Sequence, residues 1–261
     1  MNNFSRKDLQ NLESAAIPIV KKAGKYALDN WNDIHTKTLK NERDVVTNID
    51  IEIELSLRDS LHKLLPGAGF IVEEGKSDVK PHLNWSIDPI DGTKNFVNLY
   101  PLFSVQVALI FKGRPILGII YNPVSSQLFV ASSENRAKLN GDLITLSPRL
   151  NINSAIVDVD FGGNDAIINW KLEILNRLAK TVYRVRMTGG FGSVYVLTGA
   201  FDATIYLDPQ KEEKYIVDNA PRIILLQEAG YYTEFLEEQN RKFFLAANPI
   251  LAKKLGSIIL S

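Results

Sequence analysis

The chain of 261 residues contains no cysteine. Disulfide bonds, thiolate nucleophiles, zinc–thiolate centres and iron–sulfur clusters are therefore all excluded. A catalytic nucleophile must be an oxygen or nitrogen group, or a water molecule. Histidine is also scarce, with three residues in the chain. A metal ion would therefore be bound by oxygen atoms or by these histidines.

An excess of charge of either sign is absent as well. The 30 Lys and Arg residues balance 30 Asp and Glu residues, which gives a formal net charge of +0. No bulk positive field is available to hold a nucleic-acid backbone. We therefore expect no nucleic-acid partner.

Long apolar runs are missing too. No stretch approaches the roughly 18 uncharged apolar residues of a membrane span, and the first ten residues, MNNFSRKDLQ, do not resemble a secretory signal. We therefore expect a cytoplasmic protein without membrane contact. The apolar fraction of 45% and the charged fraction of 23% are close to globular averages. This composition excludes a disordered chain, a collagen-like fibre and a coiled coil.

Two helices are predicted near the N-terminus. Apolar residues recur at helical spacing from about residue 7 to residue 31. The segment Thr47–Leu65 is ambiguous, because its isoleucines and leucines both alternate as in a strand and recur every four residues. Its length and the capping-box pattern of Thr47 and Asp50 favour a helix that ends at Pro66.

The rest of the chain predicts two kinds of β structure. Short, mostly antiparallel strands are expected near Phe70–Glu73, Trp85–Asp88, Ser104–Phe111, Ile116–Tyr121 and Leu128–Ser132. From about residue 153 strands alternate with helices: strands Ala155–Asp160, Val182–Met187, Ala203–Tyr206 and Phe243–Ala247, and helices Asp165–Ala179, Ser193–Leu197, Val217–Ala229 and one from Pro249. We therefore expect an α/β protein with an α+β half over residues 1–148 and an α/β half over residues 149–261.

The stretch around Asp88 and Asp91 carries the strongest chemical signal. An apolar strand leads directly into the two aspartates, Pro89 fixes one backbone angle between them, and Gly92 permits a tight turn. Such a turn can aim both carboxylates at one point, where the free amides of a helix that starts near Gly92 could bind phosphate. A surface turn is the alternative, because Asp, Pro and Gly are common turn residues.

Further acidic residues complete this pattern. Glu73 and Glu74 end an apolar run, and strand alternation predicts that only one of them faces the site. Asp218 stands at the start of a predicted helix. Taken alone, Glu73 is typical of a solvated strand end and Asp218 of a helix N-cap. Together, buried carboxylates would be costly without a cation, and all-oxygen ligation suits Mg²⁺.

These segments resemble the inositol monophosphatase family of magnesium-dependent, lithium-sensitive phosphomonoesterases. The resemblance rests on Asp88-Pro89-Ile90-Asp91-Gly92-Thr93, on Phe70-Ile71-Val72-Glu73-Glu74, on Val217-Asp218-Asn219-Ala220 followed by Glu228-Ala229-Gly230, and on Asp44-Val45-Val46-Thr47 leading to Asp50. Order and spacing agree along nearly the whole chain. The family's layered αβαβα sugar-phosphatase fold and its homodimer are therefore expected.

The resemblance also implies site residues. The metal ligands would be Glu73, Asp88, Asp91, Asp218 and the carbonyl of Ile90, around two or three Mg²⁺ ions. The catalytic set would be Thr93, Asp50 and Glu73, in which Thr93 is hydrogen-bonded to Asp50 and orients the attacking water. The substrate would contact Asp91, Gly92, Thr93, Gly192 and Ser193.

The implied reaction is hydrolysis of a small phosphate monoester, with inositol-1-phosphate as the first candidate. Two bound ions about 3.5–4 Å apart would stabilise both the attacking and the leaving oxygen. Three departures from the family pattern keep the substrate open: Val217 replaces the usual tryptophan, segment 206–214 is longer and charged, and Gly189–Val194 lacks an arginine. The alternatives are fructose-1,6-bisphosphate, histidinol phosphate or 3′-phosphoadenosine 5′-phosphate as substrate, and a non-catalytic binding or regulatory role.

Overall fold

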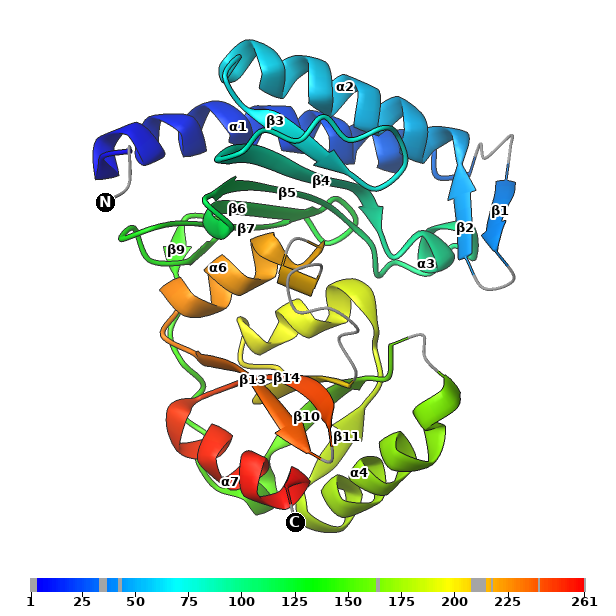
Figure 1. Cartoon of the computed structure of the whole chain (residues 1–261), viewed down its shortest axis with the longest axis vertical. Helices are drawn as coiled ribbons and strands as arrows, with labels where there is room; N and C mark the ends of the chain where they lie inside the picture. The colour runs from blue at the N-terminus through cyan, green and yellow to red at the C-terminus, as the bar shows by residue number, and fades with distance from the viewer. Residues whose placement is uncertain are drawn as a thin grey trace. The chain divides into compact units, whose positions relative to one another are not determined.

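The computed structural model describes residues 4–32, 37–41, 44–162, 165–207, 215–216, 218–238 and 240–260. Its contacts divide the chain into two compact units (Figure 1). Each unit has its own hydrophobic core. The first unit comprises Met1–Leu143 and Ile216–Glu228, and the second comprises Ile144–Tyr215 and Ala229–Ser261. Residues 216–228, which follow residue 148 in sequence, therefore belong to the first unit. The predicted mixed α/β class is confirmed.

The first unit contains a seven-stranded sheet of order β3-β4-β5-β6-β7-β8-β9. Adjacent strands are antiparallel except β3, which is parallel to β4. The strands are β3 (Gly69–Val72), β4 (Leu83–Asp91), β5 (Ser104–Phe111), β6 (Arg114–Asn122), β7 (Gln127–Ser132), β8 (Lys138–Leu139) and β9 (Asp142–Leu143). A separate antiparallel pair, β1 (Lys37–Asn41) and β2 (Asp44–Thr47), was not predicted from the sequence.

Two long helices, α1 (Arg6–Asp29) and α2 (Asn48–Leu64), lie side by side on one face of this sheet (Figure 1). The ambiguous segment is therefore a helix. Its repeat of four forms one buried stripe of Ile49, Ile53, Leu57 and Leu61, each at most 2% exposed. The capping box is present, because the Thr47 hydroxyl and the Asp50 carboxylate bond reciprocally to each other's backbone amides.

Helix α6 (Ala220–Glu228) lies on the opposite face of the same sheet (Figure 1). Its apolar side chains are buried there, and it packs closely on β6 at Gly118. A Cβ atom at Gly118 would lie 2.5 Å from Ile224 Cγ2 and 2.8 Å from the Pro221 carbonyl oxygen. This close approach explains why residues 216–228 join the first unit.

The second unit contains a five-stranded sheet of order β11-β10-β12-β14-β13. Its strands are β10 (Ile156–Asp160), β11 (Arg184–Arg186), β12 (Ala203–Leu207), β13 (Tyr232–Glu238) and β14 (Arg241–Ala247). Helices α4 (Ile168–Thr181) and α7 (Pro249–Ile259) share its core, and the short 3₁₀ segments are η1 (Ile152–Ser154), η2 (Asp165–Ile167) and η3 (Gly190–Val196). The predicted helix Ser193–Leu197 is thus part of a 3₁₀ segment, and β13 is a strand that the sequence did not predict.

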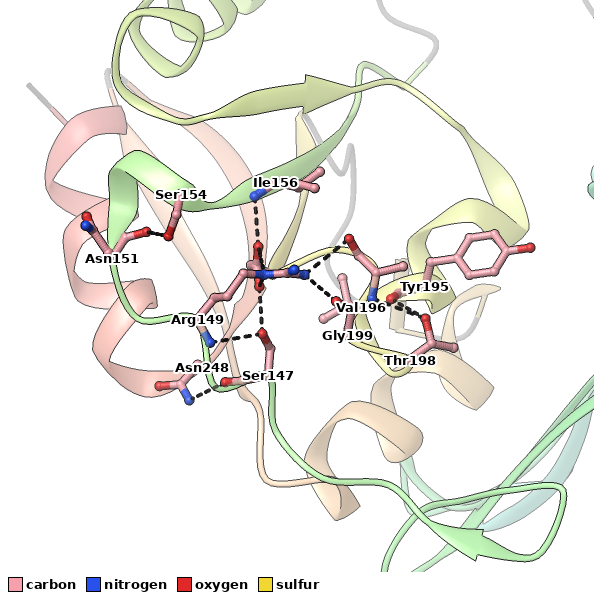
Figure 2. A network of polar contacts seen from close by, with 12 residues as sticks. Ser147, Arg149, Asn151, Ser154, Ile156, Tyr195, Val196, Thr198, Gly199 and Asn248 are labelled. Atoms are coloured by element: carbon pink, nitrogen blue, oxygen red, sulfur yellow. Dashed lines mark hydrogen bonds and ion pairs between the residues drawn. The ribbon is translucent and has the colours of Figure 1, made fainter.

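A polar network anchors the start of the second unit (Figure 2). Asp202 is fully buried and accepts hydrogen bonds from Ser147 Oγ at 2.7 Å, Arg149 Nε at 2.8 Å and the Ile156 amide at 2.8 Å. The Arg149 guanidinium also donates to the Gly199 carbonyl. The network therefore ties residues 147–149 to β10 and to the loop that precedes β12.

Over the described residues, no helix is long and apolar enough to cross a membrane.

Candidate active site

The two aspartates of the central motif lie at the end of β4, where its pairing with β5 is irregular. Asp88 pairs with Gln106 and Asp91 pairs with Ser104, so a step of three residues on β4 is matched by a step of two on β5. Residues three apart on a regular strand face opposite sides of the sheet. The bulge removes this alternation. Asp88 and Asp91 can therefore present their carboxylates to the same face.

Gly92 turns the chain from β4 into the short helix α3 (Thr93–Val97). Its φ of +88° lies in the left-handed region, which favours glycine. A Cβ atom at this position would also lie 2.9 Å from the Leu102 carbonyl oxygen. The predicted strand, tight turn and helix start are therefore present. Phosphate binding by the amides of Gly92 and Thr93 stays a prediction.

Three carboxyl groups gather at this turn. Burial raises the pKa of Asp88 well above its usual value, and the nearby carboxylates of Glu73 and Asp91 raise it further. Asp88 is hydrogen-bonded to Glu73, while its buried Oδ1 atom has no hydrogen-bond partner. Glu73 follows β3 directly, and β3 is the parallel neighbour of β4. The fold therefore brings two of the predicted acidic segments together.

A cation from the protein already contacts this cluster. Arg222 Nη2 lies 2.6 Å from Asp91 Oδ2, and its Nη1 donates to Asn219 Oδ1 at 2.6 Å. The same guanidinium lowers the pKa of Asp88, against the larger effects that raise it. Arg222 was not predicted from the sequence. Its one signal was a charged residue within the otherwise apolar run Ala220–Leu226.

Thr93 and Asp50 form the second part of the site. Thr93 Oγ1 lies within hydrogen-bond distance of Asp50 Oδ1, at 3.3 Å, and of the Ile90 carbonyl oxygen, at 2.9 Å. Asp50 is fully buried, and its other oxygen accepts from the Thr47 amide and hydroxyl at 2.9 and 2.5 Å. Burial raises the pKa of Asp50, although these hydrogen bonds lower it in part. The expected Thr93–Asp50 contact is therefore present.

Glu54 is a buried carboxylate that was not predicted from the sequence. It projects from α2, is 4% exposed, and accepts the amides of Glu74 and Gly75 at 2.8 Å each. A Cβ atom at Gly75 would lie 2.5 Å from Glu54 Oε1, so glycine fits the turn. Glu54 thus fixes the chain immediately after Glu73. Its spacing of four residues from Asp50 places both on one helix face, which is the signal that could have found it.

The remaining predicted residues have different surroundings. Asp218 is exposed and stands two residues before α6, in the first unit. Gly192 and Ser193 belong to η3 of the second unit. Gly192 is buried against the Thr188 side chain. Ser193 Oγ donates a hydrogen bond to the Gly190 carbonyl at 3.2 Å. Their roles stay predictions. Val217 and residues 208–214 lie outside the described residues.

The donor set suits a hard divalent cation. Over the part of the chain that the structure describes, no three Asp, Glu or His side chains converge on one point as metal ligands do. Asp91 is instead directed at Arg222. The buried, unpartnered Oδ1 of Asp88 and the repulsion of Asp88 by Glu73 and Asp91 nevertheless fit an oxygen-bound ion. The residues present therefore fit Mg²⁺, with Arg222 as a competing partner of Asp91.

Comparison with known proteins shows the family of the chain. A family model described as the inositol monophosphatase family matches residues 8–258. A fructose-1,6-bisphosphatase/inositol-1-monophosphatase of Thermotoga maritima is 26% identical, over 94% of both chains. The Nus factor SuhB of Pasteurella multocida is 31% identical, over 72% of this chain and 73% of that one. The crystal structure of the extragenic suppressor protein suhB from Bartonella henselae matches with a TM-score of 0.85 and 25% identity, over 94% of this chain and 97% of that chain.

Proposed function

Because the chain belongs to the inositol monophosphatase family, we propose that it hydrolyses a small phosphate monoester with the help of Mg²⁺, with inositol-1-phosphate as the first substrate to test. One observation carries this proposal. The carboxyl cluster of Glu73, Asp88 and Asp91 lies at the end of β4, where the next residues lead to the Thr93–Asp50 pair. One short turn therefore joins predicted metal ligands to a group that could orient water.

Each residue has a role in this proposal. Glu73, Asp88, Asp91, Asp218 and the Ile90 carbonyl would hold two or three ions, and such ions would supply activation of a water molecule and stabilisation of developing charge. Thr93 directs its hydroxyl proton at Asp50 or at the Ile90 carbonyl, so the lone pairs of Oγ1 can accept a hydrogen bond from the attacking water. A threonine hydroxyl is so weak an acid that it stays protonated, so it cannot serve as the base itself. Asp50 is the proton acceptor beside it.

The reaction is a displacement at phosphorus. The water oxygen forms a bond to phosphorus while the ester oxygen leaves, and the proton lost by the water ends on the leaving alkoxide. We propose that the amides of Gly92 and Thr93, together with Asp91, Gly192 and Ser193, contact the substrate. The family resemblance further supports a cytoplasmic homodimer that lithium inhibits.

The test is phosphate release from a panel of phosphate monoesters, with Mg²⁺ and with a chelator. The panel contains inositol-1-phosphate, fructose-1,6-bisphosphate, histidinol phosphate and 3′-phosphoadenosine 5′-phosphate, and the best substrate is then assayed with rising lithium chloride. D88N should lose activity by about a hundredfold or more, since a predicted ligand is removed. It should stay folded, because the substitution also relieves the repulsion from Glu73 and Asp91.

The matched control is D142N, which removes the same charge from an exposed residue of β9. It should retain full activity. No turnover of any panel member by the wild-type chain would contradict the proposal, as would full activity in chelator.

A second function is favoured by the name of one relative, Nus factor SuhB. In that case the chain would act as a binding or regulatory protein, and hydrolysis would be dispensable. D88N separates the two functions in cells that lack the wild-type gene. Restoration of the wild-type phenotype by D88N would favour the binding role, and failure of a folded D88N would favour catalysis.

A further inference from the structure

Arg222 contacts Asp91 of the acidic cluster and the neighbouring Asn219. It stands in the first turn of α6, on a helix whose other residues up to Leu226 are apolar and buried. Its guanidinium contacts Asp91 Oδ2 and Asn219 Oδ1 at 2.6 Å each. The side chains of Arg222 and Asp91 are only 14% and 10% exposed. A surface arginine would keep its guanidinium group in water. The packing of the fold therefore holds the Arg222 guanidinium away from water.

The charge of Arg222 reaches more than one predicted ligand. Asp91 is its direct partner, and Asp88 is close enough for the guanidinium to lower its pKa. Arginine keeps its positive charge at any pH that a folded protein tolerates. A divalent ion that approaches these carboxylates therefore meets a cation that has already neutralised part of their charge.

We propose that Arg222 is a resident counter-charge of the carboxylate cluster, which competes with the divalent ion for Asp91 and so sets the metal affinity of the site. The inference rests on the proposed function, and it makes Arg222 a positioning residue rather than a catalytic one. Without metal, Arg222 stabilises the cluster. When metal is added, Asp91 exchanges the guanidinium for the ion.

A purely structural role is the competing explanation. The pair joins α6 to the end of β4, and either role predicts lower stability when Arg222 is replaced. The two roles differ in metal binding. A structural pair, once lost, should leave metal affinity unchanged or weaker, because the ligands become less ordered. A competing cation, once removed, should leave metal affinity stronger.

The experiment measures Mn²⁺ binding by titration calorimetry and thermal unfolding with and without Mn²⁺, on R222Q, R222K and the wild type. R114Q is the control, since Arg114 is exposed at the start of β6 and its loss changes the net charge equally. R222Q should bind Mn²⁺ about tenfold more tightly or better, because a charge a few ångströms from the ion acts strongly at partial burial. R222K keeps the charge and should stay within about threefold of the wild type.

Thermal unfolding supplies the second readout. R222Q should unfold at a lower temperature than the wild type without metal and should gain more from saturating Mn²⁺. If the Mn²⁺ dissociation constant of R222Q equalled or exceeded that of R114Q, the inference would be overturned. The phosphatase proposal would still stand. If neither the wild type nor any variant binds Mn²⁺, both proposals fail.

Discussion

Replacing Glu54 by glutamine tests how the fold positions Glu73. The carboxylate of Glu54 is buried and accepts two backbone amides at 2.8 Å, from Glu74 and Gly75. The amide group of glutamine has one acceptor oxygen, and its NH₂ group would face an N–H donor. One charge-assisted hydrogen bond is lost and one buried amide is left without an acceptor. Since hydrogen bonds to charged groups contribute about 1.5–3 kcal/mol, we expect E54Q to lower the free energy of unfolding by about 2–3 kcal/mol.

The substitution should also affect the site without touching it. Glu74 and Gly75 follow Glu73 directly, so a looser turn gives the Glu73 carboxylate more freedom and weakens its part in metal binding. We expect E54Q to raise the Mn²⁺ dissociation constant by about tenfold, the lower end of the effect of removing a supporting interaction. Urea unfolding measures the stability, and calorimetric titration of the folded variant measures the affinity.

The control is E52Q, which makes the same chemical change at an exposed position of the same helix, where the carboxylate accepts only exposed hydrogen bonds, from the side chains of Tyr26 and Asn48, among those of the described residues. It should change the free energy of unfolding by less than about 0.5 kcal/mol. If E54Q matched E52Q in both stability and affinity, the two amide bonds would not organise the turn. If E54Q lost stability but bound Mn²⁺ normally, the link from Glu54 to Glu73 would be refuted.

Three other substitutions test further parts of the fold. G118A should destabilise the chain by about 1–3 kcal/mol and lower kcat, because the added methyl group would lie 2.5 Å from Ile224 Cγ2 and displace α6. The control is G67A, at a glycine whose added methyl group would have nothing within 4 Å, and it should change neither stability nor kcat. D202N should lower the unfolding free energy by about 3 kcal/mol, because the buried carboxylate of Asp202 accepts hydrogen bonds from Ser147, Arg149 and Ile156. A loss of less than about 1 kcal/mol, measured by urea unfolding, would contradict this prediction. Burial raises the pKa of Asp158 above 3.8, so the folded state holds a proton that the unfolded state releases more readily. The stability of the wild type relative to D158N should therefore rise as the pH falls from 7 towards 3.8, and a difference that is constant with pH would be the contrary result.

The sequence predicted the elements that have a strong local pattern. Helix α2 could be recognised because its buried residues recur every four positions and Thr47 and Asp50 form its cap. Strand β13 was missed for the opposite reason. It is an edge strand that carries Glu234, Glu237 and Glu238, so it shows neither a continuous apolar run nor a clear alternation.

The candidate site divides in the same way. Asp88 and Asp91 could be found because they follow a buried strand and precede a glycine, and Glu73 because it ends an apolar run. The family resemblance added the roles of Thr93 and Asp50. Arg222 and Glu54 could not be found, since their importance comes from contacts between segments 131 and 20 residues apart (Asp91 to Arg222 and Glu54 to Glu74). Sequence spacing does not encode such contacts. Only the packing of α6 and α2 against opposite faces of the sheet produces them.

The division into two units separates the predicted site residues into two groups. Although Asp218 comes more than a hundred residues after Asp91 in sequence, residues 216–228 belong to the first unit, so all four predicted carboxylate ligands are in one unit. Gly192 and Ser193 are in the other. The close packing of α6 on Gly118 and the Arg222–Asp91 pair both join this segment to the sheet of the first unit. Arg222 and the four predicted carboxylate ligands therefore all come from the first unit.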